Sequence, residues 1–406
     1  MTRLGDVCAI RYGKDHKKLS DGSIPAYGSG GIIRYVDTAI CEKPSVLIPR
    51  KGTLGNLFYT DKPFWTVDTL FWTNIDQTKI VPKYLYYQLK QKDLASYNVG
   101  TAVPSLTVEI LNEIDFEVPS IDKQKRIVEV LNSFDSKIAL NNQLNDYLAN
   151  LLDAAFANSA KSGSKEFGLP EVVDILSGGT PKTKNAEYWE DGRIPFFTPG
   201  DVTNSVYTLT TEKHITDVGL DNCNSELYPV DTVFLTARGT VGKVAIAGRP
   251  MAMNQSCFAF RGKSIPQSVV FQIIKNAVKT LRAKANGATF AAINTRDLKI
   301  ETVAVPCNKE IAHYDESASK WLDLIRTNEE ENLQLSALRD ILLPKLMSGE
   351  IDVSKVDLTQ LTNNHLSGCG SFCSVCCPSG LASEFHEWFR EHFFFGYGHL
   401  CKADLG

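Results

Sequence analysis

The chain has 406 residues, of which 43% are hydrophobic and 22% are charged. This composition is typical of a globular protein long enough for more than one core, and it excludes a disordered chain. No apolar run approaches the roughly 20 residues that a membrane helix needs, and the first residues lack the layout of a signal peptide. We therefore expect a cytoplasmic protein with no membrane partner.

The formal net charge of −4 conceals an uneven distribution of charge along the chain. Residues 229–299 carry eleven Lys and Arg against two Asp, and residues 1–108 carry fourteen basic against nine acidic side chains. Residues 306–358 carry six basic against eleven acidic side chains. Two basic regions beside an acidic one are compatible with a polyanionic partner that touches only the basic regions.

The first domain is predicted over residues 1–119. The segment "SVLIPR" reads as a short strand that ends near Arg50 and enters a glycine turn at Gly52. The segment "PKYLYYQLKQ" places Pro82 in the first turn of a predicted helix. The segment "GSGGII" could cradle a phosphate, but Ile33 occupies the last glycine position of G-x-G-x-x-G. We therefore interpret these glycines as turns in a mixed α/β domain.

A long helix is predicted next, over residues 120–158. Its inward positions alternate by four and three residues, which is the heptad spacing of a coiled coil. These seam positions are Ile127, Leu131, Phe134, Ile138, Asn141 and Asn145. A buried asparagine lowers stability but can fix the register of paired helices, so the two asparagines predict a partner helix.

The second domain, over residues 165–305, is predicted to be a copy of the first. Three sequence blocks match at one constant separation, which pairs Gly52 with Gly239. Upstream of them the separation is shorter, because "SIPAYGSGG" matches "RIPFFTPGD" with Pro25 over Pro195. The second copy is therefore expected to contain a longer loop, at about residues 201–228. Its segments "TVFLTARG" and "PQSVVFQIIKNAVKTLRAK" predict a strand and a helix that match those of the first copy.

The glycine turns carry basic residues in both copies. The second turn is not a P-loop, because Ala237 replaces the first glycine and Val244 follows the lysine. A basic turn that recurs inside a duplicated basic domain indicates contact with a polyanion, although isolated basic loop residues are usually only solvated. The candidate DNA contacts are Arg50, Lys51, Arg238, Lys243, Ser29 and Lys182.

A second long helix is predicted over residues 307–350. Its seam includes Ile311, Trp321, Ile325, Asn328, Asn332 and Leu335. We expect this helix to pair with the first one in antiparallel fashion, as a coiled coil. Apolar residues also lie off both seams, as a bundle shared with partner subunits would require: Val128, Val130, Leu140, Leu144, Tyr147 and Leu151 on the first helix, and Leu324, Leu333, Leu338, Ile341 and Leu346 on the second.

The tail, residues 359–406, is rich in cysteine and aromatic residues. Cys373 and Cys376 form one C-x-x-C, and histidines and Cys401 follow without a second pair of regular spacing. Zinc is therefore the less favoured interpretation, and we expect a poorly ordered extension that holds no metal.

No catalytic signature stands out in the sequence. We find no tetrapeptide of the Asn-Pro-Pro-aromatic kind that amino-methyltransferases use, no helicase P-loop and no cluster of nuclease carboxylates. These absences favour a protein that recognises a target and needs no cofactor over an enzyme.

The arrangement of domain, helix, domain, helix resembles the specificity (S) subunit of type I restriction-modification systems. The segments that carry this resemblance include "RKGTLGNLFYTDKPFWTVDTLFW", "GTAVPSLT", "VPSIDKQKRIVEVLNSFDSKI", "LSGGTPKTKNAEYWEDGRIPFFTPGD" and "LRDILLPKLMSGEI". The resemblance covers residues 1–357 and stops before the tail.

The resemblance implies a protein without catalytic activity of its own. Each domain would read one half of a bipartite site in double-stranded DNA. The paired helices would set the gap and dock two methyltransferase (M) subunits, through which restriction (R) subunits join. Residues 123–156 alone would span about 50 Å as a helix, so we expect a gap of several base pairs. A stand-alone DNA-binding regulator or scaffold with two domains remains the alternative.

Overall fold

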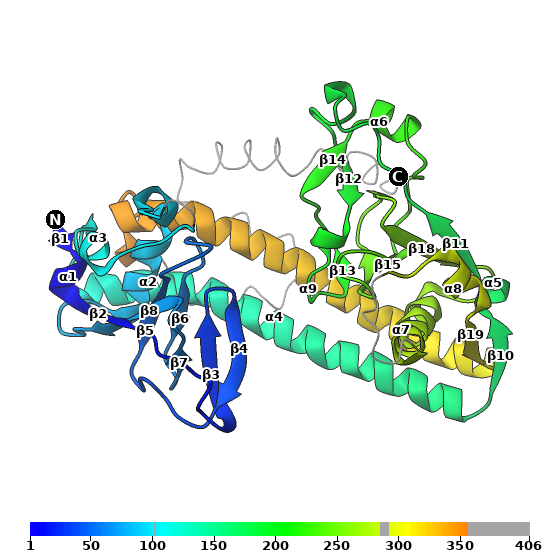
Figure 1. Ribbon diagram of the computed structural model, residues 1–406, viewed down its shortest axis with the longest axis horizontal. Helices are drawn as coiled ribbons and strands as arrows, with labels where there is room; N and C mark the ends of the chain where they lie inside the picture. The colour runs from blue at the N-terminus through cyan, green and yellow to red at the C-terminus, as the bar shows by residue number, and fades with distance from the viewer. Residues whose placement is uncertain (101–102, 285–291, 356–406) are drawn as a thin grey trace, which may run out of the picture. The chain divides into compact units, whose positions relative to one another are not determined.

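The computed structural model describes residues 1–100, 103–284 and 292–355, so the cysteine-rich tail lies outside the described residues. The chain divides into two compact units. Among the described residues, one contains Met1–Asp135 and residues 338–355, and the other is Ser136–Ala337. Each unit holds one β-rich lobe, and two long helices join the lobes (Figure 1). The predicted fold class, mixed α/β with two repeated domains and two long paired helices, is confirmed.

The first lobe consists of the elements up to β9. They are β1 (Thr2–Arg3), α1 (Leu4–Val7), β2 (Cys8–Tyr12), β3 (Asp21–Gly28), β4 (Gly31–Val36), β5 (Ser45–Pro49), β6 (Phe58–Thr60), β7 (Trp65–Thr66), β8 (Leu70–Ile75), α2 (Pro82–Lys90), a 3-10 helix (Leu94–Tyr97), α3 (Val108–Asn112) and β9 (Asp115–Phe116). Strands β2-β8-β5-β6 form an antiparallel sheet, and β4-β3-β7 form a second sheet in which β3 and β7 are parallel. Every residue of β5 is buried, as in a central strand.

The second lobe begins at β10. Its elements are β10 (Ser164–Gly168), α5 (Leu169–Val172), β11 (Val173–Ser177), a 3-10 helix (Ala186–Tyr188), β12 (Ile194–Phe197), a 3-10 helix (Pro199–Asp201), β13 (Tyr207–Thr208), β14 (Lys213–Ile215), α6 (Asp217–Asp221), β15 (Val233–Thr236), β16 (Val244–Ala247), β17 (Ala252–Met253), β18 (Cys257–Gly262), α7 (Gln267–Lys284), α8 (Thr295–Ile300) and β19 (Thr302–Pro306). Its sheets have the orders β11-β18-β15-β16-β13 and β14-β12-β17.

The two lobes share one topology. Strands β11, β18, β15 and β16 repeat the pairing of β2, β8, β5 and β6, and β14-β12-β17 repeats β4-β3-β7, including its parallel pair. Strands β8 and β18 are separated along the chain by the same interval as Gly52 and Gly239, and so are helices α3 and α8. The side chains that cap those two helices, Thr107 and Asn294, keep that interval too. The longer loop of the second copy contains β13, which has no counterpart among the described residues of the first lobe.

A glycine marks the same close approach in both lobes. A Cβ atom on Gly13 would lie 2.0 Å from the carbonyl oxygen of Val67, and one on Gly178 would lie 2.3 Å from that of Asn254. Because backbone meets backbone at both places, only a residue without a side chain fits there. The repeat therefore extends to local packing that sequence matching alone had not singled out.

The long helices are α4 (Ile121–Lys161) and α9 (Asn308–Ser348), followed by a 3-10 turn (Val353–Lys355). Asn141 donates to the side-chain oxygen of Asn332 at 2.9 Å, and Asn328 donates to that of Asn145 at 2.8 Å. The partner number falls as the α4 number rises, so the helices run antiparallel (Figure 1). All four asparagines that the heptad pattern placed inward thus bond across the pair.

Most seam positions are buried. The buried ones are Ile127, Leu131, Phe134, Asn141, Asn145, Ile311, Ile325, Asn328 and Leu335, whereas Ile138, Trp321 and Asn332 are half-buried. Two of the residues predicted to lie off the seam are nevertheless buried within the chain and are not available to a partner subunit: Val130 is 3% exposed and Leu346 is 1% exposed. Both belong to the unit of the first lobe, where each helix buries more than one face.

Candidate nucleic-acid interface

Two turns meet in the first lobe. Gly52 has φ +93°, a conformation that favours glycine, and a Cβ atom there would lie 3.5 Å from Ser29 Oγ. The side chain of Asn56 donates to the carbonyl oxygen of Ser29 at 3.2 Å, which ties the turn after β5 to the β3–β4 turn. Lys51 is exposed beside this junction. The structure therefore brings Ser29 and Lys51 together.

Arg50 is held differently from Lys51. Its guanidinium donates to the carbonyl oxygen of Asp68 at 3.2 Å and lies 5.3 Å from the ring centroid of Tyr12, which is 53% exposed. At the separation that pairs Gly52 with Gly239, the equivalent of Arg50 in the second lobe is the buried Ala237. The basic position that recurs in both turns is therefore Lys51 with Arg238.

The second lobe repeats the junction of two turns. Gly239 and Gly242 have φ of +76° and +77°, and the hydroxyl of Thr240 donates to the carbonyl oxygen of Pro199 at 2.9 Å. Arg238 and Lys243 are exposed on this turn. Lys182 is also exposed but lies on another loop, where its carbonyl oxygen accepts a hydrogen bond from the indole of Trp189.

Sequence reasoning missed Arg282, which supports the second turn from α7. Its guanidinium donates to the carbonyl oxygens of Val241 and Gly242 at 2.9 and 3.1 Å. A basic residue near the end of an amphipathic helix is usually expected to point into solvent. Nothing in the sequence indicates that Arg282 contacts the turn at Val241 and Gly242, about 40 residues earlier. These bonds fix the backbone of the turn that carries Arg238 and Lys243.

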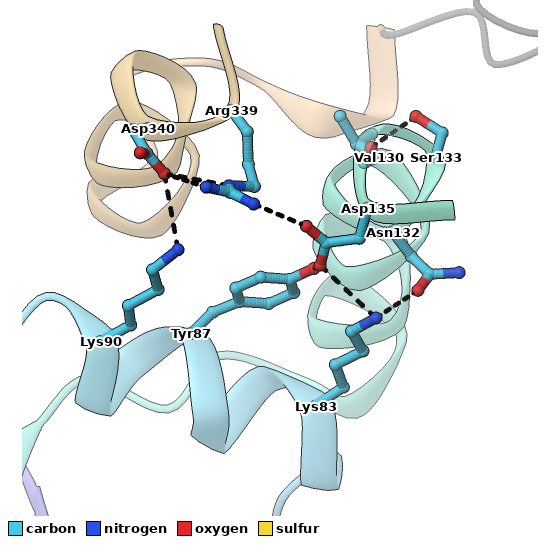
Figure 2. A network of polar contacts seen from close by, with 9 residues as sticks. All are labelled: Lys83, Tyr87, Lys90, Val130, Asn132, Ser133, Asp135, Arg339 and Asp340. Atoms are coloured by element: carbon cyan, nitrogen blue, oxygen red, sulfur yellow. Dashed lines mark hydrogen bonds and ion pairs between the residues drawn. The ribbon is translucent and has the colours of Figure 1, made fainter. Parts of the chain in front are cut away.

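The first lobe is fixed to the long helices by a charged network around Asp135 (Figure 2). The Asp135 carboxylate accepts hydrogen bonds from Tyr87 at 2.5 Å and Arg339 at 2.9 Å, and Lys83 lies 3.5 Å away. Burial alone would raise the pKa of Asp135, but the hydrogen bonds from Tyr87 and Arg339 and the charge of Lys83 lower it below its ordinary value. Helix α2 is thereby joined to both α4 and α9.

The second lobe uses a buried carboxylate on α9 instead. Glu329 is 7% exposed and accepts hydrogen bonds from the backbone N–H groups of Val206 and Tyr207, at 3.1 and 3.2 Å. Burial raises the pKa of Glu329 to about 7, and the two backbone hydrogen bonds offset this only in part. Glu329 is the first of three consecutive glutamates in the sequence. Such a run usually indicates a solvent-exposed face of a helix, so the sequence does not predict that Glu329 is buried.

The comparisons with known proteins agree with this architecture. The family model described as type I restriction modification DNA specificity domain matches residues 1–150 and 161–334. The chain belongs to this family. Each of the two matched regions contains one lobe and part of a long helix.

Individual relatives are distant. The chain is 30% identical over 172 residues to the type I restriction enzyme MjaIX specificity subunit of Methanocaldococcus jannaschii, a match that covers 40% of this chain and 39% of that protein. It is 21% identical to the HindI specificity subunit of Haemophilus influenzae, over 67% of this chain and 78% of that one. A crystal structure of a type I restriction-modification system S subunit from M. genitalium has the same fold, with TM-score 0.52 and 18% identity, and covers 85% of this chain and 95% of that one.

A row of apolar side chains is exposed on α4. Leu140, Leu144, Tyr147 and Leu151 follow one another at intervals of four and three residues and are between 39% and 60% exposed. On α9, Leu324 and Leu333 are also exposed. Single exposed apolar residues are ordinary, but a row at heptad spacing is the pattern of a helix that packs against another helix.

Among the described residues, no three His, Cys, Asp or Glu side chains are grouped so that they could hold a metal ion. None of the described helices is both long and apolar enough to cross a membrane. The candidate functional features among the described residues are the paired turns of the two lobes and the exposed row on α4.

Proposed function

We propose that this protein is the DNA-reading subunit of a type I restriction-modification complex and acts in the cytoplasm, with methylation and cleavage performed by partner subunits. Each lobe would read one half of a bipartite site in double-stranded DNA. The observation that carries this proposal is the duplication itself, because two lobes of one topology present the same junction of glycine turns and basic side chains.

The junctions suit contact with the DNA backbone. Lys51, Arg238 and Lys243 are exposed, and lysine and arginine on a fixed turn are the side chains that contact phosphates. Phosphate contacts position a protein on DNA, whereas base edges in the major groove supply the sequence information. We therefore assign these turns to positioning and leave base readout to other side chains of each lobe.

The long helices would recruit the enzymatic subunits. The exposed row Leu140, Leu144, Tyr147 and Leu151 offers an apolar surface at the spacing of a helical bundle. We propose that two methyltransferase subunits dock on the helix pair, and that restriction subunits join through them. No cofactor is assigned to this chain.

The test is co-expression with a type I methyltransferase subunit from the same host, followed by purification and methylation assays with S-adenosylmethionine. We expect the complex to methylate a bipartite site and the chain alone to methylate nothing. Methylation or cleavage by the rigorously pure chain would contradict the proposal, and so would failure to bind the methyltransferase.

The DNA contacts are tested within that complex. Replacing Lys51 or Arg238 by alanine should weaken binding to all sequences alike and reduce the slope of log affinity against log salt by about one for each lost contact. Lys165, an exposed lysine of β10, is the matched control. Equal effects of Arg238→Ala and Lys165→Ala would remove the turn from the interface.

A further inference from the structure

Both lobes contain a hollow at the same place. In the first lobe it measures about 330 Å³ and in the second about 220 Å³. Tyr59 and Asp135 line the first hollow, and their equivalents in the repeat, Ile246 and Leu322, line the second. Each hollow thus lies between the sheet's β6 or β16 strand, the following helix and a long helix.

In the second lobe, strand β13 lies at the edge of the sheet beside this hollow. β13 lies parallel to β16, with Tyr207 opposite Ile246. The N–H groups of Ile246 and Gly248 donate to the carbonyl oxygens of Val206 and Thr208, at 2.9 Å each. Tyr207, which is 4% exposed, lines the hollow, and its hydroxyl donates to Asp231 at 3.1 Å.

The first lobe has no such strand among its described residues. β3 ends at Gly28 and β4 begins at Gly31, so the turn between them is too short to supply one, whereas β12 ends at Phe197 and β14 begins only at Lys213. β6 is therefore an edge of its sheet in the part of the chain that the structure describes. An open edge presents backbone N–H and C=O groups that another strand can pair with.

The hollow beside that edge is lined by aromatic rings. Its walls include Tyr27, Phe58, Tyr59 and Tyr86, all half-buried. The rings of Tyr27 and Phe58 are 5.9 Å apart, and those of Tyr59 and Tyr86 are 6.0 Å apart. An aromatic side chain that entered this hollow could contact these rings in an edge-to-face or offset arrangement.

We propose that an extended segment of the methyltransferase partner adds to the open edge of β6, parallel to it, and places an aromatic side chain in this hollow. The partner's segment would occupy the position that β13 occupies in the second lobe. The identity of the partner rests on the proposed function, in which that subunit docks along α4. Asp135, which lines the hollow, is itself a residue of α4.

A protein segment fits this place better than DNA does. Lys83 is the cation of the hollow, but it lies 3.5 Å from the Asp135 carboxylate and bonds to Asn132, so the pair offers no net charge for a phosphate. A carboxylate in the wall repels a phosphate as well. A strand, by contrast, would satisfy the backbone edge and fill the apolar space at once, which is strand addition to an exposed sheet edge.

Photo-crosslinking in the purified complex tests the proposal. p-Benzoylphenylalanine is placed at Tyr59, in the hollow, and as a matched control at Tyr35, an aromatic residue of β4 that is 52% exposed. After irradiation we expect the Tyr59 probe to crosslink the methyltransferase at least ten-fold more than the Tyr35 probe. The crosslinked peptide, identified by mass spectrometry, should contain an aromatic residue in an extended segment.

The outcomes separate this proposal from the proposed function. A chain that never binds the methyltransferase overturns both. A complex that forms and methylates DNA, but in which the Tyr59 probe crosslinks nothing, labels DNA, or labels no more than the Tyr35 probe, overturns the strand proposal alone.

A second pair of variants tests the backbone hydrogen bonds. Asp61 is the equivalent of Gly248, whose N–H bonds to β13 in the second lobe. Asp61→Pro removes that N–H, whereas Asp61→Ala keeps it, and Asp61 is exposed. We expect Asp61→Pro to reduce the Tyr59 crosslink about five-fold relative to Asp61→Ala, the factor that one hydrogen bond of about 1 kcal/mol supplies. Equal yields would contradict strand pairing at this edge.

Discussion

The two lobes share a strand order, a pair of capped helices and a junction of glycine turns, yet each is fixed to the long helices by different chemistry. The first lobe uses side chains, with Asp135 between Tyr87, Lys83 and Arg339. The second adds the backbone of β13, which Glu329 holds, to a more exposed pair between Lys275 and Asp153. The position equivalent to Asp135 is Leu322, so the first network has no counterpart in the second lobe.

This difference teaches what the duplication preserves. Backbone pairing and close approaches of backbone are the same in both copies, because a change there would disturb a whole sheet. Contacts between a lobe and a helix depend on a few side chains, and these have changed independently. The lobes should therefore respond alike to changes in backbone packing and differently to changes in the side chains that anchor them.

The substitutions expected to lower the free energy of unfolding most should have the same effect in both lobes. Gly13→Ala and Gly178→Ala each force a methyl group against a carbonyl oxygen, and we expect each to lower the free energy of unfolding of its lobe by about 3 kcal/mol. Gly30→Ala, which meets nothing within 4 Å, and Gly200→Ala, whose nearest contact is 3.6 Å, are the controls and should change it by less than about 1 kcal/mol. Urea unfolding measures all four, and a loss of less than about 1 kcal/mol for Gly13→Ala or Gly178→Ala would contradict the equivalence of the lobes.

The pH dependence of stability should distinguish the second lobe. The pKa of Glu329 is raised from 4.5 to about 7 in the folded protein, so between these values the folded state holds a proton that the unfolded chain has released. The contribution to the free energy of unfolding is therefore complete below pH 4.5 and is lost as the pH rises through 7. Relative to Glu329→Gln, the wild type should lose about 2 to 3 kcal/mol between pH 5 and pH 8.

Hydrogen exchange localises that loss. The amides of β13 and of its neighbour β16 should lose protection with rising pH in the wild type, while those of β5 and β8 in the first lobe should not follow them. An identical pH profile for the wild type and Glu329→Gln would remove Glu329 as the cause.

A smaller difference in the free energy of unfolding is expected between substitutions of two aspartates on α4. Asp135 contacts α2 of the first lobe, and Asp153 contacts α7 of the second. Asp135→Asn leaves Lys83 and Arg339 without their carboxylate, and we expect a loss of about 2 kcal/mol in the free energy of unfolding. Asp153→Asn breaks a pair with Lys275 in which the carboxylate is 40% exposed, so its loss should stay below about 1 kcal/mol. Equal losses in urea unfolding would show that burial does not set the strength of these contacts.

The sequence predicted the features that repeat. The constant separation of the matching blocks located the second lobe, and heptad spacing located both long helices and the asparagines that bond across them. Those signals are local or periodic, so one chain contains them in full. The helices proved to have 41 residues each, and every observed end lies within three residues of the predicted one.

The features that sequence reasoning missed depend on long-range contacts. Arg282 reaches the backbone of Val241 from another element, and Glu329 meets amides that are distant along the chain. Nothing in the residues around either side chain indicates such a partner. Val130 and Leu346 were assigned to outer faces because a heptad pattern has one seam, whereas the helices bury more than one face in the unit of the first lobe.

The central claim is that two lobes read two half-sites whose gap is set by the paired helices. A helix of 41 residues spans about 60 Å at ~1.5 Å per residue. Inserting one heptad at facing points in α4 and α9 keeps the seam in phase and lengthens each helix by about 10 Å, or about three base pairs. The decisive measurement is genome-wide mapping of methylated sites with the extended chain in its complex. The account predicts unchanged half-site sequences and a gap wider by about three base pairs; an unchanged gap in an assembled, active complex would contradict it.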